Sequence, residues 1–253
     1  MIYIKTKKEI DLIRESCRIV AETLQLVGGN VKLGVSTFEL DQIAEDYIRS
    51  NNAIPAFKGY SQGGLPGFPG SVCTSLNDAV VHGIPGSVKL KEGDIISLDV
   101  GVLKNNYYGD AAITVAVGKI SDEKKKLLEV TEKSLYLGIE QAKSGNKVHD
   151  ISSAVQEYVE QNGFSIVRDL CGHGVGKFLH EDPAIPNFGK KSTGSKLKNG
   201  MTLAIEPMVN AGVYSVKTAS DGWTVLTSDG SPSAHFEHTI LVLDNSPEIL
   251  TVC

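Results

Sequence analysis

Four carboxylates lie in the most apolar stretches of the chain. Asp99 stands within IISLDVGV and Asp110 opens DAAITVAV, whereas Glu206 follows MTLAI and Glu237 precedes HTILVL. A single acid on a strand is most simply explained as a surface charge on an exposed sheet face. Four acids in apolar runs, with no Lys or Arg embedded among them, instead require a counter-charge, because burying an unpaired carboxylate is strongly unfavourable.

Divalent metal ions are the counter-charge that suits this set. With His173, from the segment CGHGVGKFLHEDP, the acids form an oxygen-rich donor set that favours a pair of divalent ions over a structural zinc. Their four negative charges balance two such ions, which would activate a bridging water as a nucleophile at neutral pH. The glycines around His173 lead us to expect that metal and substrate approach the backbone closely there.

The first two acids are predicted to meet on a β-hairpin. The stretch IISLDVGVLKNNYYGDAAITVAV contains two β-rich runs joined by a segment in which asparagine tolerates left-handed geometry. A two-residue loop at Lys104 and Asn105 would place Asp99 directly opposite Asp110, with Cβ atoms ~5 Å apart. A turn shifted by one step would make the acids diagonal neighbours. In both registers two like charges come close and need a shared proton or a cation.

Amphipathic helices are predicted around these strands. Residues 7–27 carry apolar side chains at helical spacing, and Ser36 and Glu39 have the spacing of a capping box that opens a second helix. Residues 122–143 and 149–163 repeat this two-helix pattern.

The order of elements repeats along the chain. Each half reads as helix, helix, His-Gly, strand with acid, strand with acid. A glycine precedes Asp99 by six residues, and another precedes Glu206 by six. Such agreement is difficult to obtain by chance. We therefore predict an α/β (α+β) chain of two related halves, about residues 1–120 and 121–253, that form one domain around one cleft.

Composition narrows the class of protein. The net charge of −5 over 253 residues offers no electrostatic footprint for nucleic acid or anionic lipid. The first residues contain no signal-peptide core, and no run approaches the ~18 apolar residues of a membrane span. The four cysteines form no CxxC pair, which indicates reduced thiols. These features predict a cytoplasmic protein without a membrane or nucleic-acid partner.

Several segments together resemble a known family over nearly the whole chain. They are SVCTSLNDAVVHGIP, EGDIISLDVGV, GDAAITVAVG, CGHGVGKFLHEDP, LAIEPMVNAG and DGWTVLTSDGSPSAHFEHTILV. The sequence resembles the type I methionine aminopeptidases, which share the pita-bread fold with creatinase and proline-specific peptidases. The resemblance implies a curved antiparallel sheet covered by helices. It also implies a metalloexopeptidase that removes initiator methionine from nascent proteins, preferring a small second residue.

The resemblance also implies site residues. Two divalent ions (Co, Fe, Mn or Zn) would be held by a set in which Asp110 and Glu237 bridge both: Asp99, Asp110, His173, Glu206 and Glu237. Glu206 would also act as general base for the attacking water. His82 would meet the scissile amide nitrogen or the amine end, and His180 the carbonyl oxygen as negative charge develops. Without the resemblance, each of these two histidines would be explained as a structural residue.

The implied methionine pocket contains a cysteine and aromatic side chains. Its members are Cys73, Tyr60 and Trp223, with Phe57 and Leu179 as weaker candidates. A soft aromatic lining suits the polarisable methionine sulfur, although core packing is the ordinary role of a lone tryptophan. Asn77 and Ser233 resemble residues near a monovalent-cation site. The implied partners are nascent polypeptide N-termini and, transiently, the ribosome, and we expect a monomer.

Three rival functions are considered. Proline-specific peptidases of this fold carry a large extra N-terminal domain, whereas the first helix here is predicted within ten residues of Met1. Type II methionine aminopeptidases insert a helical segment into the second half, and no insertion is visible. A non-catalytic binding module on this scaffold would lose metal ligands, and the sequence has all five.

Two single residues depart from the family pattern. Ala111 stands where threonine is usual, which removes a hydroxyl beside the bridging carboxylate and puts its geometry in doubt. His235 stands where glutamine is common, on the same strand face as Glu237. It could perturb the site, but a histidine at the solvent edge is the simpler expectation.

The loop GYSQGGLPGFPGS, residues 59–71, is richer in glycine than the family pattern and lies beside the implied methionine pocket. We expect it to be mobile without substrate, because glycine leaves the backbone many conformations. Crystallographic B-factors measure this. Uniformly low values across residues 60–70, in a crystal where the loop makes no lattice contact, would contradict the expectation.

Overall fold

The fold was derived from a computed structural model that describes residues 2–61 and 64–253. Part of the loop at residues 59–71 thus lies outside the described residues, and its mobility stays a prediction. Four helices occur in the described chain: α1 (Lys7–Gly29), α2 (Thr37–Ser50), α3 (Asp122–Gln141) and α4 (Val148–Gln161). They match the four segments predicted from hydrophobic periodicity, with ends that differ by at most two residues.

The strands form one large sheet and two small ones. The strands of the large sheet are β1 (Ile54–Pro55), β2 (Cys73–Leu76), β4 (Ile95–Lys104), β5 (Tyr107–Ala116), β7 (Cys171–Gly174), β8 (Glu181–Pro186), β9 (Thr202–Ile205), β14 (Glu237–Leu241) and β15 (Glu248–Ile249). Those of the small sheets are β6 (Ser165–Ile166), β10 (Met208–Asn210) and β13 (Ser233–His235), and β3 (Ala79–Val81), β11 (Val216–Thr218) and β12 (Val225–Thr227).

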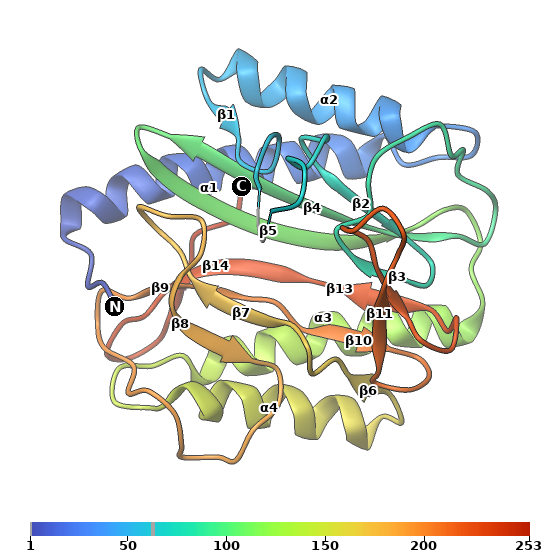
Figure 1. Ribbon diagram of the computed structural model, residues 1–253. Helices are drawn as coiled ribbons and strands as arrows, with labels where there is room; N and C mark the ends of the chain where they lie inside the picture. Colours follow the sequence, from blue (N-terminus) through green and yellow to red (C-terminus); the bar gives the residue numbers. More distant parts are fainter. Residues whose placement is uncertain (1, 62–63) are drawn as a thin grey trace.

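The large sheet joins the two parts of the chain at its centre. Its order is β1-β4-β5-β14-β9-β7-β8, and the paired strands are antiparallel. The β5–β14 pair therefore connects a strand from the first half to one from the second. Helices α1 and α2 pack on the side of β4 and β5, whereas α3 and α4 lie together on the opposite side of the molecule (Figure 1).

The helices begin at residues whose side chains satisfy free backbone groups. Ser36 accepts the Glu39 backbone N–H, and the Glu39 carboxylate accepts the Ser36 N–H, which confirms the predicted capping box. Thr6 and Glu9 form the same reciprocal pair at the start of α1. Each box satisfies two of the donors that a helix N-terminus leaves without intrahelical partners.

The β4–β5 hairpin has the shifted register. Its loop consists of Asn105 and Asn106, with φ of +51° and +65°, so a loop at Lys104 and Asn105 is wrong. Positive φ at both loop residues matches the right-handed twist of the flanking strands, and asparagine adopts that conformation more readily than lysine. Asp99 consequently pairs with Ala112 and Asp110 with Gly101. The two acids are diagonal neighbours, the second of the two registers considered.

Two large hydrophobic clusters cover the sheet. One joins α1 and α2 to β4 through residues such as Val20, Leu40 and Leu98. The other joins α3 and α4 to β9 and β14 through residues such as Leu135 and Ile240. Within residues 2–61 and 64–253, no helix combines the length and apolar character that crossing a membrane requires.

Leu98→Ala tests the packing that fixes β4. Leu98 is fully buried between the sheet and the N-terminal helices, so the substitution should lower the free energy of unfolding by about 2–5 kcal/mol. Urea denaturation in the presence of a chelator measures this without a contribution from metal binding. The matched control is Leu33→Ala at a leucine that is 56% exposed, where we expect a change within about 0.5 kcal/mol. Equal losses for the two variants would contradict this packing.

Candidate metal centre

The five predicted ligands come from five consecutive strands of the large sheet. In the order β4, β5, β14, β9 and β7, the strands place Asp99, Asp110, Glu237, Glu206 and His173, with Glu206 directly after its strand. Strand pairing fixes their relative positions along the strands, because Glu237 pairs with Ala112 and His173 pairs with Ala204. Residues up to 138 positions apart in the sequence are thereby brought to one place.

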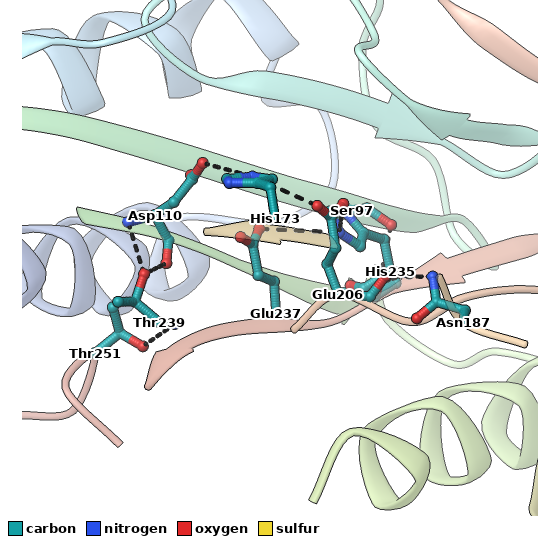
Figure 2. Close-up of polar contacts among 10 residues, drawn as sticks. Ser97, Asp110, His173, Asn187, Glu206, His235, Glu237, Thr239 and Thr251 are labelled. Carbon is teal, nitrogen blue, oxygen red and sulfur yellow. Dashed lines mark hydrogen bonds and ion pairs between the residues drawn. The ribbon is translucent and has the colours of Figure 1, made fainter. Parts of the chain in front are cut away.

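The distances among these side chains are those of a compact cluster. His173 Nε2 lies 3.6 Å from Glu206 Oε1 and 3.9 Å from Asp110 Oδ2. One ligand atom each from Asp110, His173 and Glu237 lies within 4.8 Å of the other two. Figure 2 shows these side chains converging from different strands. The structure thus brings together four of the five predicted ligands by direct distances, and Asp99 lies on the neighbouring strand.

Burial shifts the pKa values of the side chains in this cluster far from their usual range. It raises the pKa of Asp99 to about 7 and that of Glu206 to about 8. Burial and repulsion from neighbouring carboxylates hold the pKa values of Asp110 and Glu237 well above their usual range. Burial, followed by the nearby His180, lowers the pKa of His173 to about 3. His173 is therefore a neutral imidazole with a lone pair available for binding.

The cluster fits divalent metal ions. Asp99 Oδ1, Asp110 Oδ1 and Glu237 Oε1 are buried without a hydrogen-bond partner. Among the ion pairs of residues 2–61 and 64–253, none joins the four carboxylates to Lys or Arg. Buried carboxylate oxygens without partners are costly unless a cation binds them. Carboxylates with imidazole are a donor set suited to first-row divalent ions.

The glycines beside His173 are explained by strand packing. A Cβ on Gly172 would collide with Ala204 O, and a Cβ on Gly174 with Asp182 O, so β7 fits between its neighbours only without side chains there. This differs from the expectation that the glycines admit metal and substrate. Gly174 instead accepts the His173 Nδ1–H at 2.9 Å, which fixes the tautomer that leaves Nε2 facing the carboxylates.

A cavity of about 660 Å³ opens above the cluster. The candidates for the methionine pocket lie in its wall: Phe57, Tyr60, Cys73, Leu179 and Trp223. Burial and the nearby carboxylates raise the pKa of the Cys73 thiol, so it is neutral. Phe68, which the sequence did not single out, is 3% exposed and meets Trp223 edge-to-face at 5.5 Å between ring centroids. The one sequence signal for a role of Phe68 was its position in an aromatic, glycine-rich loop.

Both candidate catalytic histidines also line the cavity. His180 Nδ1 lies 3.0 Å from Tyr60 Oη, and its ring centroid is 4.5 Å from that of His173. His82 has φ of +59°, a conformation that non-glycine residues adopt rarely and mostly where surrounding structure enforces it. Burial lowers the pKa of His82 to about 4 and also lowers that of His180. Both rings are therefore neutral near pH 7.

A buried ion pair supports the segment that carries His180. Lys5 Nζ lies 2.5 Å from Glu181 Oε2, and both side chains are almost fully buried. The other Glu181 oxygen accepts the backbone N–H groups of Lys177 and Phe178. The N-terminal segment thereby ties down the residues on both sides of His180. The sequence offered no signal for this pair, because 176 positions separate its members.

The structure places both residues that depart from the family pattern, His235 and Ala111, in buried positions. His235 is 1% exposed and faces the carboxylates, so the expectation of a histidine at the solvent edge is wrong. The pairing of β13 with β10 turns it inward. Ala111 is buried in β5, and the backbone of Asp110 is held by Thr239, whose hydroxyl accepts the Asp110 N–H and donates to the Asp110 carbonyl.

Asn77 and Ser233 lie next to each other, because the Ser233 N–H donates to the Asn77 carbonyl at 2.8 Å. The Asn77 side-chain oxygen already accepts from Lys124 Nζ at 2.8 Å. The Lys124 ammonium group thus lies against the Asn77 side chain, on one side of the predicted cation position. A monovalent cation here stays a prediction.

Comparisons with known proteins agree on one family and one fold. Residues 11–244 match the model of a family described as Metallopeptidase family M24. The chain is similar to a methionine aminopeptidase of Clostridium acetobutylicum, at 54% identity over 100% of both chains, and to methionine aminopeptidase 1 of Bacillus subtilis, at 55% identity over 99% of both. The crystal structure of a methionine aminopeptidase from Rickettsia prowazekii superposes with a TM-score of 0.96, at 43% identity over 100% of both chains. The predicted pita-bread fold is confirmed.

The raised carboxylate pKa values generate a pH prediction for the metal-free protein. A carboxyl group whose pKa is higher in the folded than in the unfolded state binds more protons when folded, so its contribution to stability is full below the unfolded pKa of about 4 and is lost as pH rises through the folded pKa. With folded values of about 7 for Asp99 and about 8 for Glu206, we expect stability to fall between pH 7 and 8.5. Above the ordinary histidine pKa of about 6.5, the buried histidines no longer contribute to this slope.

Urea denaturation at several pH values measures the slope. Saturating Co²⁺ should reduce it strongly, because the bound ions favour the ionised carboxylates. A smaller slope of the same sign should remain from the buried Cys17 and Cys73 thiols, whose pKa values burial raises. Asp99→Asn should reduce it in the metal-free protein. Constant or increasing stability of the chelator-treated wild type across this range would contradict the assignment.

Proposed function

The chain belongs to metallopeptidase family M24, and on that premise we propose that it is a methionine aminopeptidase, a hydrolase that removes methionine from the N-terminus of polypeptide chains. Curated relatives at 46–55% identity over 94% or more of both chains carry that name. One observation of the structure carries the proposal. Three buried carboxylates, the partly buried Glu206 and a neutral imidazole line the floor of an aromatic cavity that is large enough for an amino-acid side chain and its peptide bond.

Five side chains would hold two divalent ions. They are Asp99, Asp110, His173, Glu206 and Glu237. When bound, such ions supply Lewis acidity and lower the pKa of a water molecule. In the metal-bound protein Glu206 would be ionised near neutral pH and could accept a proton.

The cavity wall selects the first side chain of the substrate. Tyr60, Cys73 and Trp223 with Phe68 present aromatic faces and a neutral thiol. Methionine is unbranched and has a polarisable sulfur, so it makes favourable contacts with aromatic ring edges and faces. The N-terminal amine then lies towards the metal-binding cluster at the floor of the cavity. A longer chain leaves the cavity on its open side, as an exopeptidase requires.

Glu206 is the proposed general base. It takes a proton from the attacking water, whose oxygen bonds to the carbonyl carbon of methionine. The carbon–nitrogen bond then breaks, and Glu206 returns the proton to the departing amine. The products are free methionine and a polypeptide that is shorter by one residue. The position of Glu206 directly after a strand end leaves its side chain free to face the cavity.

The two cavity histidines act on the scissile bond. If the Tyr60 hydroxyl donates to His180 Nδ1, the proton of the neutral ring is on Nε2. Nε2–H then donates to the carbonyl oxygen as negative charge develops, which stabilises the transition state more than the ground state. His82 contacts the scissile amide nitrogen or the amine end of the substrate. The Lys5–Glu181 pair keeps the segment around His180 in place for this role.

The cellular setting and the choice of metal belong to the same proposal. We propose that the chain acts in the cytoplasm, as a single domain and a monomer, on nascent polypeptides in transient contact with the ribosome. Iron, manganese, cobalt and zinc all suit a site of carboxylates and imidazole. A monovalent cation near Asn77 and Ser233 is also proposed.

Peptide hydrolysis after metal removal and restoration tests the function. The chelator-treated protein should be inactive, and restored Co²⁺, Mn²⁺, Fe²⁺ or Zn²⁺ should release methionine from Met-Ala-Ser. A small second residue fits close to the metal cluster, so we expect kcat/KM for Met-Lys-Ser to be lower by roughly tenfold or more. Chromatographic quantification of free methionine provides the measurement. An Ala-Pro peptide, the substrate of the proline-specific rival, should remain intact, and hydrolysis of that peptide alone would reject the methionine assignment.

A further inference from the structure

His235 is a buried imidazole whose Nε2 has no hydrogen-bond partner. Its side chain is 2% exposed. The backbone on both sides of the ring is fixed, because the His235 N–H donates to Thr114 Oγ1 at 2.9 Å and its carbonyl accepts from the same hydroxyl at 2.7 Å. Ser97 Oγ holds that hydroxyl in turn, at 2.8 Å. The ring is thereby directed towards the carboxylates (Figure 2).

The distances from His235 are those of neighbouring metal ligands. Nε2 lies 3.5 Å from Glu206 Oε2 and 4.0 Å from Glu237 Oε2. Both separations exceed the usual 2.7–3.2 Å of an N–H···O hydrogen bond. Two donor atoms that each lie about 2.1 Å from one ion are themselves about 3–4 Å apart. An ion between these three atoms would satisfy a nitrogen that is otherwise buried without a partner.

The donor atoms also fall into two groups of the same kind. Asp110, His173 and Glu237 form one triad, and Glu206, His235 and Glu237 form the other, each with its ligand atoms within 4.8 Å of one another. Glu237 belongs to both. Each triad contains one imidazole, so the cluster offers a nitrogen donor on either side of the shared carboxylate. The glutamate between the two rings, Glu206, directs one oxygen at His173 and the other at His235.

We propose that His235 binds a divalent metal ion through Nε2 and is a sixth protein ligand, so that the centre contains two imidazoles. The proposal rests on the proposed function, because it needs a metal centre at this place. Its chemical consequence is a shift in metal preference. Imidazole favours cobalt, iron, nickel and zinc over manganese, which prefers oxygen donors. His235 should therefore strengthen binding of Co²⁺ more than binding of Mn²⁺.

The NMR spectrum of the Co²⁺-loaded protein tests the proposal directly. Ring protons of a histidine bound to high-spin Co²⁺ are strongly shifted, and the N–H signals are recognised because they vanish in D₂O and appear in histidine-labelled protein. We expect two such N–H signals in the wild type, one from His173 and one from His235. His235→Gln should lose one of them, and it should lose more affinity for Co²⁺ than for Mn²⁺ in calorimetric titrations.

The matched control is His238→Gln. His238 lies on β14 next to Glu237, but its ring Nδ1 lies 2.8 Å from Thr251 Oγ1 on the other face of the strand. This variant should retain both signals. Circular dichroism checks that the variants are folded. If His235→Gln fails to fold, the number of shifted N–H signals in the wild type still tests the proposal.

The number of shifted signals separates failure of this proposal from failure of the proposed function. One shifted N–H signal in the wild type, unchanged in His235→Gln, would overturn the proposal and leave His235 as a neighbour of Glu206 outside the coordination sphere. That result would leave the proposed function intact, since His173 would still be bound and Met-Ala-Ser still cleaved. An absence of shifted signals from the wild type would overturn both, because the chain would then bind no Co²⁺ through histidine.

Discussion

The electrostatic cost of holding four carboxylates together in a largely buried cluster governs how the strands and side chains around them are arranged. Within the described chain, Asp99, Asp110, Glu206 and Glu237 gain no lysine or arginine partner, and three of their oxygens are buried without a hydrogen bond. Carboxylates without a positive partner and carboxylate oxygens without a hydrogen bond are both unfavourable in a protein interior. The arrangement is understandable if divalent cations supply the missing charge. The folded chain therefore gains free energy from cation binding, and it is less stable when the metal is removed.

Sheet topology is what makes this concentration of charge possible. Five adjacent strands each position one candidate ligand, and the β5–β14 pair joins the two halves of the chain at the middle of the series. The strands are covered by the helices that pack on them, and this packing fixes the strands that carry the candidate site residues. The cavity residues lie above the frame on shorter elements. His180 is held from two directions, by Tyr60 and by the segment that the Lys5–Glu181 ion pair anchors.

Local pattern predicted most of the frame. Helical periodicity and the Ser36–Glu39 capping box located the helices, since both signals depend on residues a few positions apart. Four of the five metal-binding candidates followed from acids in apolar runs, and the fifth, His173, from its glycine-rich segment. The hairpin register followed from Asn105 and Asn106 only once both φ values were known. The register depends on turn geometry, and a single-step shift there moves every cross-strand pair.

Features that depend on contacts between distant segments could not be predicted in the same way. The glycines around His173 allow β7 to fit between its neighbours, and the sequence does not reveal which backbone will approach them. His235 was expected at the solvent edge because its strand neighbours alone say nothing of the Thr114 hydroxyl that fixes it inward. The Lys5–Glu181 pair and the packing of Phe68 on Trp223 are likewise tertiary.

Anomalous diffraction from a crystal grown with Co²⁺ shows whether the carboxylate cluster binds metal. Data collected at the cobalt absorption edge locate the ions independently of any assumption about ligands. We expect two peaks among Asp99, Asp110, His173, Glu206 and Glu237, each within bonding distance of several of their donor atoms. A map with no peak there, at a Co²⁺ concentration that saturates binding in solution, would contradict the claim that these buried carboxylates exist to bind metal.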